Sequence, residues 1–283
     1  MRQIVDVERR FMSIHFPASG ILDDIVVGPT AQHEWWYQER ASLEVDRGPW
    51  NTFSACFEAP AKRELEFCEQ FGKPRLHVKR YLRETHQFQK LSPIPYQHLL
   101  ANYLKLAPYL DVPFDHRMSR PTLRYPDFSP NNILVNTSND VVGIIDWQHT
   151  VILPLYLCAG IPDHFQNWGD PLSETLSKPE TIRRRIVHFY YATLTMKSLP
   201  DHFNAIRTEN CMLRAKLFYY AQAPWEGDSV SLKYTISQTR SVKCPIHFSK
   251  EEMQKCSEEH RQEQEKLQEL GEIRDLIGTD AVS

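Results

Sequence analysis

The stretch YPDFSPNNILVNTSNDVVGIIDW, residues Tyr125 to Trp147, contains the pattern that decides the fold. Two short runs of aliphatic, largely β-branched residues, Ile133 to Val135 and Val141 to Ile145, are typical of strands. The polar segment between them, Asn136 to Asp140, is rich in residues that form turns. The pattern therefore predicts an antiparallel hairpin.

Polar residues, which are costly to bury, stand at the open end of this predicted hairpin. In an antiparallel pair, the residue before the first strand lies opposite the residue after the second, so we expect Asn132 and Asp146 to meet, about 5 Å apart. Asp127 lies five positions before Asn132 in the same entering loop. The hairpin is thus expected to gather two carboxylates and an amide oxygen.

These three groups suit phosphoryl transfer. An amide and a carboxylate form a partial shell for Mg²⁺, which keeps waters and substrate phosphates as its other ligands, so Asn132 and Asp146 are candidate metal ligands. Asp127 is then placed to accept the proton of an attacking hydroxyl and orient it toward the terminal phosphoryl group. Asn and Asp also commonly cap turns around a purely structural hairpin, and the spacing alone leaves both interpretations open.

The composition bounds the class of protein. The 283 residues, 41% of them hydrophobic, are enough to fill a core, and the formal net charge of -3 gives no reason to expect a nucleic acid or a membrane as partner. Six scattered cysteines without a C-x-x-C pair indicate reduced thiols rather than a disulfide scaffold or a zinc site. No apolar run reaches the ~18 residues of a membrane span.

Apolar periodicity predicts helices around the hairpin. The predicted segments are 4–14, 31–42, 60–71, 76–88, 96–109, 153–159 and 181–197. Ser249 to Glu252 fits a capping box that opens a charged helix running to Ile277 and stopped by Gly278. We therefore predict two regions, a main domain over 1–248 and a charged C-terminal helix and tail over 249–283.

The loop and hairpin also carry a family resemblance. Tyr125 to Asn132, followed by Ile144 to Trp147, resembles the H-x-D-x-x-x-x-N and I-D-W pattern of the aminoglycoside phosphotransferases, relatives of protein kinases. Tyr125 stands where that family has His. Further stretches resemble the fungal branch containing the altered inheritance of mitochondria phosphotransferases: IVDVERR (4–10), FPASG (16–20), DRGPW (46–50), DWQHT (146–150) and WEGD (225–228).

The resemblance implies a set of roles. Asp127 would be the catalytic base, Asn132 and Asp146 would hold Mg²⁺, ATP would be the co-substrate, and a small-molecule hydroxyl would be the acceptor. The acceptor pocket is expected in the segments after the hairpin, with 165–170 and 225–228 as candidates by position. The fungal relatives imply a mitochondrial address, and a soluble intracellular protein is the expectation without them.

One part of a kinase-like enzyme is missing from the sequence. Such enzymes cover the phosphates with a glycine-rich loop and hold them with a Lys paired to a helix Glu. The ten glycines never form G-x-G. Lys79, the best candidate for that lysine, lies too close to Asp127 in the sequence and within a helical pattern. The segment of this chain that starts at Ile4 resembles the first helix of the large lobe in that family.

The expected fold is therefore α+β: a mostly helical C-terminal (large) lobe of the protein-kinase-like fold, with one catalytic hairpin and without the N-terminal lobe. Apolar residues near 1–16 and around the hairpin should be exposed where the small lobe would sit. By ancestry the reaction is ATP- and Mg²⁺-dependent phosphoryl transfer to a small-molecule hydroxyl, weak or absent in this chain. The alternative is a non-catalytic binding or scaffold protein that meets a protein partner at this exposed face.

Overall fold

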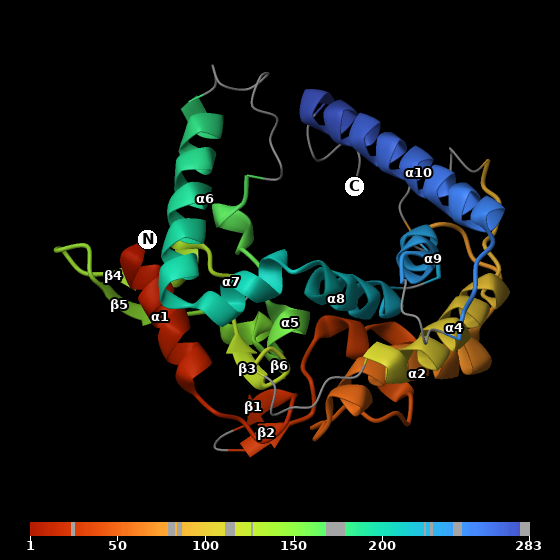
Figure 1. The fold of residues 1–283 in the computed structure, drawn as a ribbon, viewed down its shortest axis with the longest axis horizontal. Coiled ribbons are helices and arrows are strands. Elements are labelled where there is room, and N and C mark those ends of the chain that lie inside the picture. Colours follow the sequence, from red (N-terminus) through yellow and green to blue (C-terminus); the bar gives the residue numbers. More distant parts are fainter. Residues whose placement is uncertain are drawn as a thin grey trace. The chain divides into compact units, whose positions relative to one another are not determined.

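The computed structural model describes residues 1–23, 26–78, 83, 87–110, 117–125, 127–167, 179–223, 225–226, 229–239 and 245–277 (Figure 1). Helices predominate and the strands form small antiparallel pairs, so the fold class is α+β. The chain divides into two compact units. Unit 1 comprises residues 1–36, 47–56 and 112–215, and unit 2 comprises 37–46, 57–111 and 216–283.

Unit 1 contains all the described strands. Its helices are α1 (Arg2–Ser13), α5 (Leu155–Cys158), α6 (Pro179–Ser198) and α7 (Pro200–Arg207). Its strands are β1 (Ile21–Asp23), β2 (Val26–Gly28), β3 (Pro121–Arg124), β4 (Ile133–Val135), β5 (Val141–Ile144) and β6 (Val151–Pro154). Short 3₁₀ turns occur at η1 (His33–Trp35), η3 (Pro130–Asn132), η4 (Trp147–His149) and η5 (Asp163–Phe165). Helices α2 (Phe53–Phe71) and α8 (Glu209–Ala221) have residues in both units.

The strands form three separate two-stranded sheets, β1 with β2, β3 with β6, and β4 with β5. The β4–β5 pair is the predicted hairpin, but the expectation of a single hairpin among helices missed the other two pairs. Leu153 and Pro154, predicted as the start of a helix, belong to β6, and α5 begins only at Leu155. Because every residue of β6 is buried, the strand shows no alternation of polar and apolar residues, and its periodicity resembles that of a buried helix.

Helices α1 and α6 confirm two predicted segments, 4–14 and 181–197. α1 places Val5, Glu8 and Met12 in the core of unit 1, where it packs against β3 and α6. One turn of helix separates these positions, so all three lie on the same face. A buried glutamate on that face is unusual and needs a partner.

Unit 2 is helical. It contains η2 (Gln38–Ser42), α4 (Ile94–Leu110), α9 (Val230–Ser237), α10 (Lys250–Ile277) and most of α2. The predicted helix over 96–109 is confirmed by α4. The helix predicted over 60–71 begins earlier, at Phe53, after Thr52 accepts a hydrogen bond from the amide of Ala55, and it contains Pro60 in its interior.

Of two further helix predictions, one is wrong and the other falls largely outside the described residues. The helix predicted over 31–42 is replaced by the two 3₁₀ turns η1 and η2. Much of the helix predicted over 76–88, including Lys79, lies outside the described residues.

The buried charges of unit 2 centre on Glu64. Its two carboxylate oxygens accept from Nε and Nη2 of Arg40 at 2.7 and 2.6 Å, and Oε1 also accepts from Nε of Arg63 at 2.8 Å. All three side chains are buried. This pairing compensates the cost of removing the charges from water, which an unpaired buried charge would not recover.

The predicted charged helix is confirmed by α10. The capping box is formed: the hydroxyl of Ser249 accepts from the amide of Glu252 at 3.1 Å, and the amide of Ser249 donates to the Glu252 carboxylate at 2.7 Å. α10 packs on α9, where Lys233 pairs with Glu259 at 2.7 Å. The division of the chain at residue 248 stays a prediction. Among the described helices, none has both the length and the apolarity needed to cross a bilayer.

Candidate functional site

The β4–β5 hairpin has a different register from the predicted one. Val135 lies opposite Val141 at the turn, and a bulge advances the register by one residue, so that Ile133 pairs with Ile144. Asn132 therefore faces Ile145, whose amide donates to the Asn132 carbonyl at 3.0 Å. The expectation that Asn132 lies directly opposite Asp146 is wrong by one residue, because the hairpin turn and the bulge set the pairing.

Asp127 and Asn132 meet directly. Nδ2 of Asn132 donates to the Asp127 carboxylate at 3.1 Å and to the Asp127 backbone carbonyl at 3.2 Å, and both side chains are half-buried. The loop between them is tight because the Ser129 amide donates to the Asp127 carbonyl at 2.7 Å and the Ser129 hydroxyl accepts from the Asn131 amide. With its amide nitrogen directed to Asp127, Asn132 keeps Oδ1 as the atom suited to a metal ion.

Tyr125 connects this loop to the end of the hairpin. Its hydroxyl donates to the carbonyl of Ile145 at 2.8 Å, and its side chain is buried. Burial raises the pKa of Tyr125, the charges of Asp127 and Asp146 raise it further, and a hydrogen bond from Asn132 opposes them. The phenol therefore stays protonated at neutral pH. The Tyr125 hydroxyl thus joins the start of the Asp127 loop to the residue before Asp146.

Asp146 has an unusual backbone conformation. It lies in the left-handed region with φ 64° and ψ 59°, at the residue before η4. Such a conformation costs a non-glycine residue about 1 kcal/mol, although Asp tolerates it better than most. Its side chain is exposed and makes no hydrogen bond to any other part of the chain that the structure describes. A strained residue with an uncommitted carboxylate is typical of a functional position.

Trp147, next to Asp146, contacts the ring of Tyr125. The Trp147 ring lies 5.2 Å from the Tyr125 ring and 5.4 Å from the Phe11 ring of α1, between centroids. Its indole nitrogen donates to the carbonyl of Ile144 at 3.0 Å. The aromatic contacts fix the chain on both sides of Asp146.

The structure also brings His164 to this loop, which sequence reasoning missed. Nε2 of His164, in η5, lies 3.2 Å from the Ser129 hydroxyl. The two residues are 35 positions apart, and no local pattern predicts their contact.

The predicted acceptor segments contain buried and paired side chains where they are described, and their role as an acceptor pocket stays a prediction. Phe165 is buried and stacks on Tyr191, with 5.6 Å between ring centroids. In unit 2, Trp225 is buried and Glu226 pairs with Arg75 at 3.1 Å. Residues 168–170 and 227–228 lie outside the described residues.

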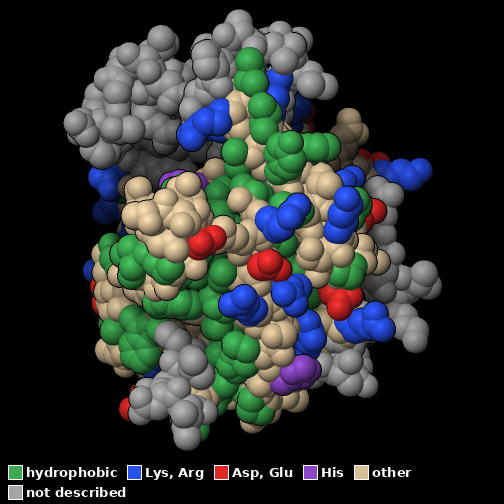
Figure 2. Space-filling view, turned by 90° about the vertical axis from the view of Figure 1, so that its left-hand side faces the viewer, with side chains coloured by type: hydrophobic (Ala, Val, Ile, Leu, Met, Phe, Trp, Pro, Cys, Tyr) green, Lys and Arg blue, Asp and Glu red, His purple; other side chains and the backbone are tan. Residues whose placement is uncertain are grey.

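Apolar side chains around the hairpin are exposed, as expected. They are Leu134, Val135, Val142, Ile145 and Trp147, between 41 and 64% exposed. Figure 2 views the side of Figure 1 on which β4, β5, α1 and α6 are labelled, and shows hydrophobic side chains at the surface among Lys and Arg. In α1 the expectation fails for Val5 and Met12, which are buried. A hollow of about 500 Å³ lies between the first turn of α1 and the hairpin, lined among others by Ile4, Ile133 and Val141.

By their chemistry, Asn132 and Asp146 are candidate ligands for a metal ion held together with a substrate rather than by the protein alone. The described residues contain no cluster of three or more His, Cys, Asp or Glu side chains that would hold an ion. Asn132 and Asp146 offer one amide and one carboxylate oxygen, the hard oxygen ligands that Mg²⁺ takes when phosphates and waters complete its shell. The fit therefore depends on a phosphate-bearing ligand.

Comparison with known proteins identifies distant relatives. A subtelomeric hrmA-associated cluster protein, found in two strains of Aspergillus fumigatus, is 26% identical over 353 residues, which cover 99% of this chain and 68% of that protein. No protein-family model matches the chain. No solved structure matches it either. The relatives' name describes a gene cluster and no activity, so the resemblance to aminoglycoside phosphotransferases rests on the motifs of the loop and the hairpin.

Proposed function

We propose that this chain is a domain of the kinase-like phosphotransferase type that binds Mg²⁺ and the phosphates of ATP at Asn132 and Asp146, with Asp127 as the base. The observation that supports it best is the pairing of Asn132 with Asp127, because it sets a candidate base beside a candidate metal ligand. The exposed carboxylate of Asp146, held in the left-handed conformation one residue after the Ile145 carbonyl that accepts from Tyr125, supplies the second ligand.

Each residue has a distinct task in this proposal. Oδ2 of Asp127 is engaged by Asn132, which leaves Oδ1 to accept the proton of an acceptor hydroxyl. As that proton moves to Asp127, the acceptor oxygen bonds to the terminal phosphorus of ATP and the bond from phosphorus to the ADP oxygen breaks. Bound Mg²⁺ would neutralise charge on the phosphate oxygens. Tyr125 would keep the Asn132 and Asp146 ends of the hairpin in register through Ile145.

Transfer by this chain is proposed to be slow. Phosphoryl transfer depends on positioning and electrostatic stabilisation, and kinase-like enzymes supply much of both from a glycine-rich loop and a lysine. The sequence has no G-x-G loop, so the phosphates would be held from the hairpin side. Turnover well below ~1 s⁻¹ is therefore expected.

Metal binding is the direct test. Calorimetric titration of the protein with Mn²⁺ and ATP should show binding. Asp146→Ala should weaken this binding at least tenfold, because one of two protein ligands is lost. Asp6→Ala is a matched control, since it removes an exposed carboxylate whose ion pair with Arg9 lies on α1. Equal affinity of Asp146→Ala and the unmodified protein would refute the proposed site.

A second candidate function is a non-catalytic scaffold. The exposed apolar side chains of the hairpin, such as Leu134 and Val142, favour it, because exposed apolar patches often mark protein contacts. Absence of any response to Mn²⁺ with ATP, in calorimetry and in thermal unfolding, would favour this alternative over the phosphotransferase.

A further inference from the structure

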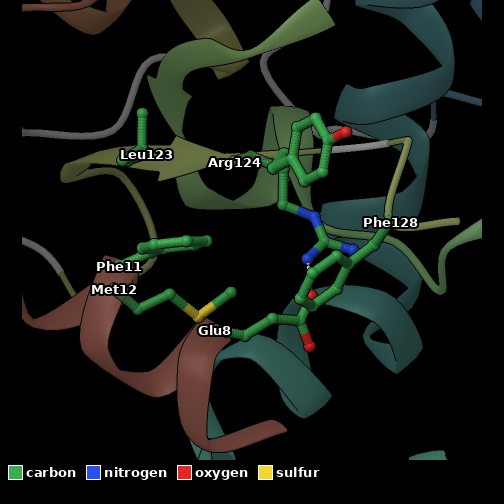
Figure 3. A pocket seen from close by; sticks show the side chains of 7 residues that line it. Glu8, Phe11, Met12, Leu123, Arg124 and Phe128 are labelled. Carbon is green, nitrogen blue, oxygen red and sulfur yellow. Dashed lines mark hydrogen bonds and ion pairs between the residues drawn. The ribbon is translucent and has the colours of Figure 1, made fainter. Parts of the chain in front are cut away.

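A buried charged cluster lies immediately before the Asp127 loop. Arg124, the last residue of β3, pairs with the Glu8 carboxylate of α1 and donates a hydrogen bond to the carbonyl of Gly160. The hydroxyl of Tyr191, on α6, donates to the second Glu8 oxygen at 2.7 Å. Figure 3 shows the Arg124 guanidinium directed at the Glu8 carboxylate, with Met12 beside them. The cluster thus ties together β3, α1, α6 and the segment after α5.

The cluster is buried. Arg124, Glu8 and Tyr191 are at most 3% exposed, and the pocket that Glu8 and Arg124 line has no room for a water molecule. Burial by itself would lower the pKa of Arg124, but the charge and hydrogen bond of Glu8 outweigh burial and raise it. Burial raises the pKa of Tyr191. Arg124 is therefore charged and Tyr191 remains a donor.

Stability alone does not account for such a pair. Apolar residues of similar volume often stabilise a core as well as, or better than, a buried ion pair, because the charges need not be desolvated. An ion pair with defined hydrogen bonds differs from an apolar contact in fixing direction and register. The residue that follows Arg124 is Tyr125, whose hydroxyl reaches Ile145, and Asp127 comes two positions later.

We propose that Glu8, Arg124 and Tyr191 are positioning residues that set the Asp127–Asn132 loop for metal and phosphate binding. The cluster fixes the end of β3 against α1 and α6. Tyr125, the next residue, is fixed to the hairpin by its hydrogen bond to the Ile145 carbonyl. The loop is held at its start by both. This inference rests on the proposed function, because it assigns the cluster a role in that same site.

Removal of one hydroxyl group tests the proposal without removing a side chain from the core. Tyr191→Phe deletes the donor to Glu8 and keeps the ring. Tyr103→Phe is the matched control: its hydroxyl, equally buried, donates to the Phe57 carbonyl at 2.6 Å in unit 2, which contains none of the three site residues. Two signals are measured for both variants: hydrogen–deuterium exchange at the amides of Ser129, Asn132 and Ile145, and the dissociation constant for Mn²⁺ with ATP.

Tyr191→Phe should exchange these amides at least tenfold faster and weaken Mn²⁺ binding at least fivefold, whereas Tyr103→Phe should change each less than twofold. Glu8→Gln, with Glu64→Gln of the buried unit 2 cluster as its control, should repeat the contrast more strongly. Equal exchange at the loop in Tyr191→Phe and Tyr103→Phe would overturn the positioning role. Failure of the unmodified protein to bind Mn²⁺ with ATP would instead overturn the proposed function, so the two failures are read from different signals.

Discussion

Asn132 donates its side-chain amide to the carboxylate of Asp127 at 3.1 Å, and to the carbonyl of the same residue at 3.2 Å. The two residues occupy the ends of one tight loop, so the backbone brings them together and the side chains then restrain each other. A carboxylate held in this way loses little conformational entropy when it accepts a proton from a substrate. This relationship links the proposed base to Asn132, one of the two proposed metal ligands, while Asp146, the other, takes no part in it.

Asp127→Asn should abolish phosphoryl transfer and preserve metal binding. The amide cannot accept the proton of the acceptor hydroxyl, so loss of the terminal phosphate of ATP should slow at least ~100-fold in single-turnover measurements. The affinity for Mn²⁺ with ATP should stay within threefold, because Asn132 and Asp146 are unchanged. A variant with undiminished transfer would show that Asp127 is not the base.

Tyr125→Phe should weaken the metal site through the hairpin. The buried phenol is replaced by a ring that cannot donate to the Ile145 carbonyl, and the free energy of unfolding should fall by about 1 kcal/mol. Because Asp146 follows Ile145, its carboxylate should be less well placed, and Mn²⁺ affinity should fall several-fold in calorimetry. Tyr125→His, which restores a donor, should recover part of that affinity. Identical metal affinity in the Phe and His variants would show that the hydrogen bond from residue 125 does not support the metal site.

Asp146→Gly should stabilise the fold relative to Asp146→Ala while both lose metal affinity. Glycine adopts φ 64° without the penalty that alanine incurs, so the two variants should differ by about 1 kcal/mol in the free energy of unfolding, measured with urea. Calorimetry should show equally poor Mn²⁺ binding for both. If the glycine variant were no more stable than the alanine variant, the left-handed conformation of Asp146 would be in doubt.

His202 should make unit 1 sensitive to acid. It is fully buried beside Gly160, and burial, followed by the charge of Arg124, lowers its pKa well below the usual 6.5. Below pH ~6.5 the unfolded chain binds a proton that the folded chain does not, so stability should fall as the pH falls, by at most about 1.4 kcal/mol per pH unit for this group. Thermal unfolding between pH 7 and 5 should show a smaller loss for His202→Gln, and an unchanged slope would assign the acid sensitivity elsewhere.

Local patterns in the sequence were sufficient for several elements. The amphipathic spacing from Ile4 to Ile14 predicted α1, the β-branched runs around Asn136 to Asp140 predicted the β4–β5 hairpin, and the capping box at Ser249 predicted the start of α10. Each depends on residues within a few positions of one another, where backbone preferences and neighbouring side chains act without help from the rest of the chain. The loop that pairs Asp127 with Asn132 belongs to the same class.

Only the tertiary structure decided the contacts between distant segments. β3 pairs with β6 across 26 intervening residues (125–150), Arg124 meets Glu8 across 116 positions and Tyr191 meets Glu8 across 183. Burial selects these partners, because a charge or an unpaired strand in the core must find whatever complement the whole fold brings near it. The sequence by itself therefore determined which residues are candidates for the proposed phosphate and metal site. The packing of α1, β3 and α6 decided how the loop bearing these residues is held.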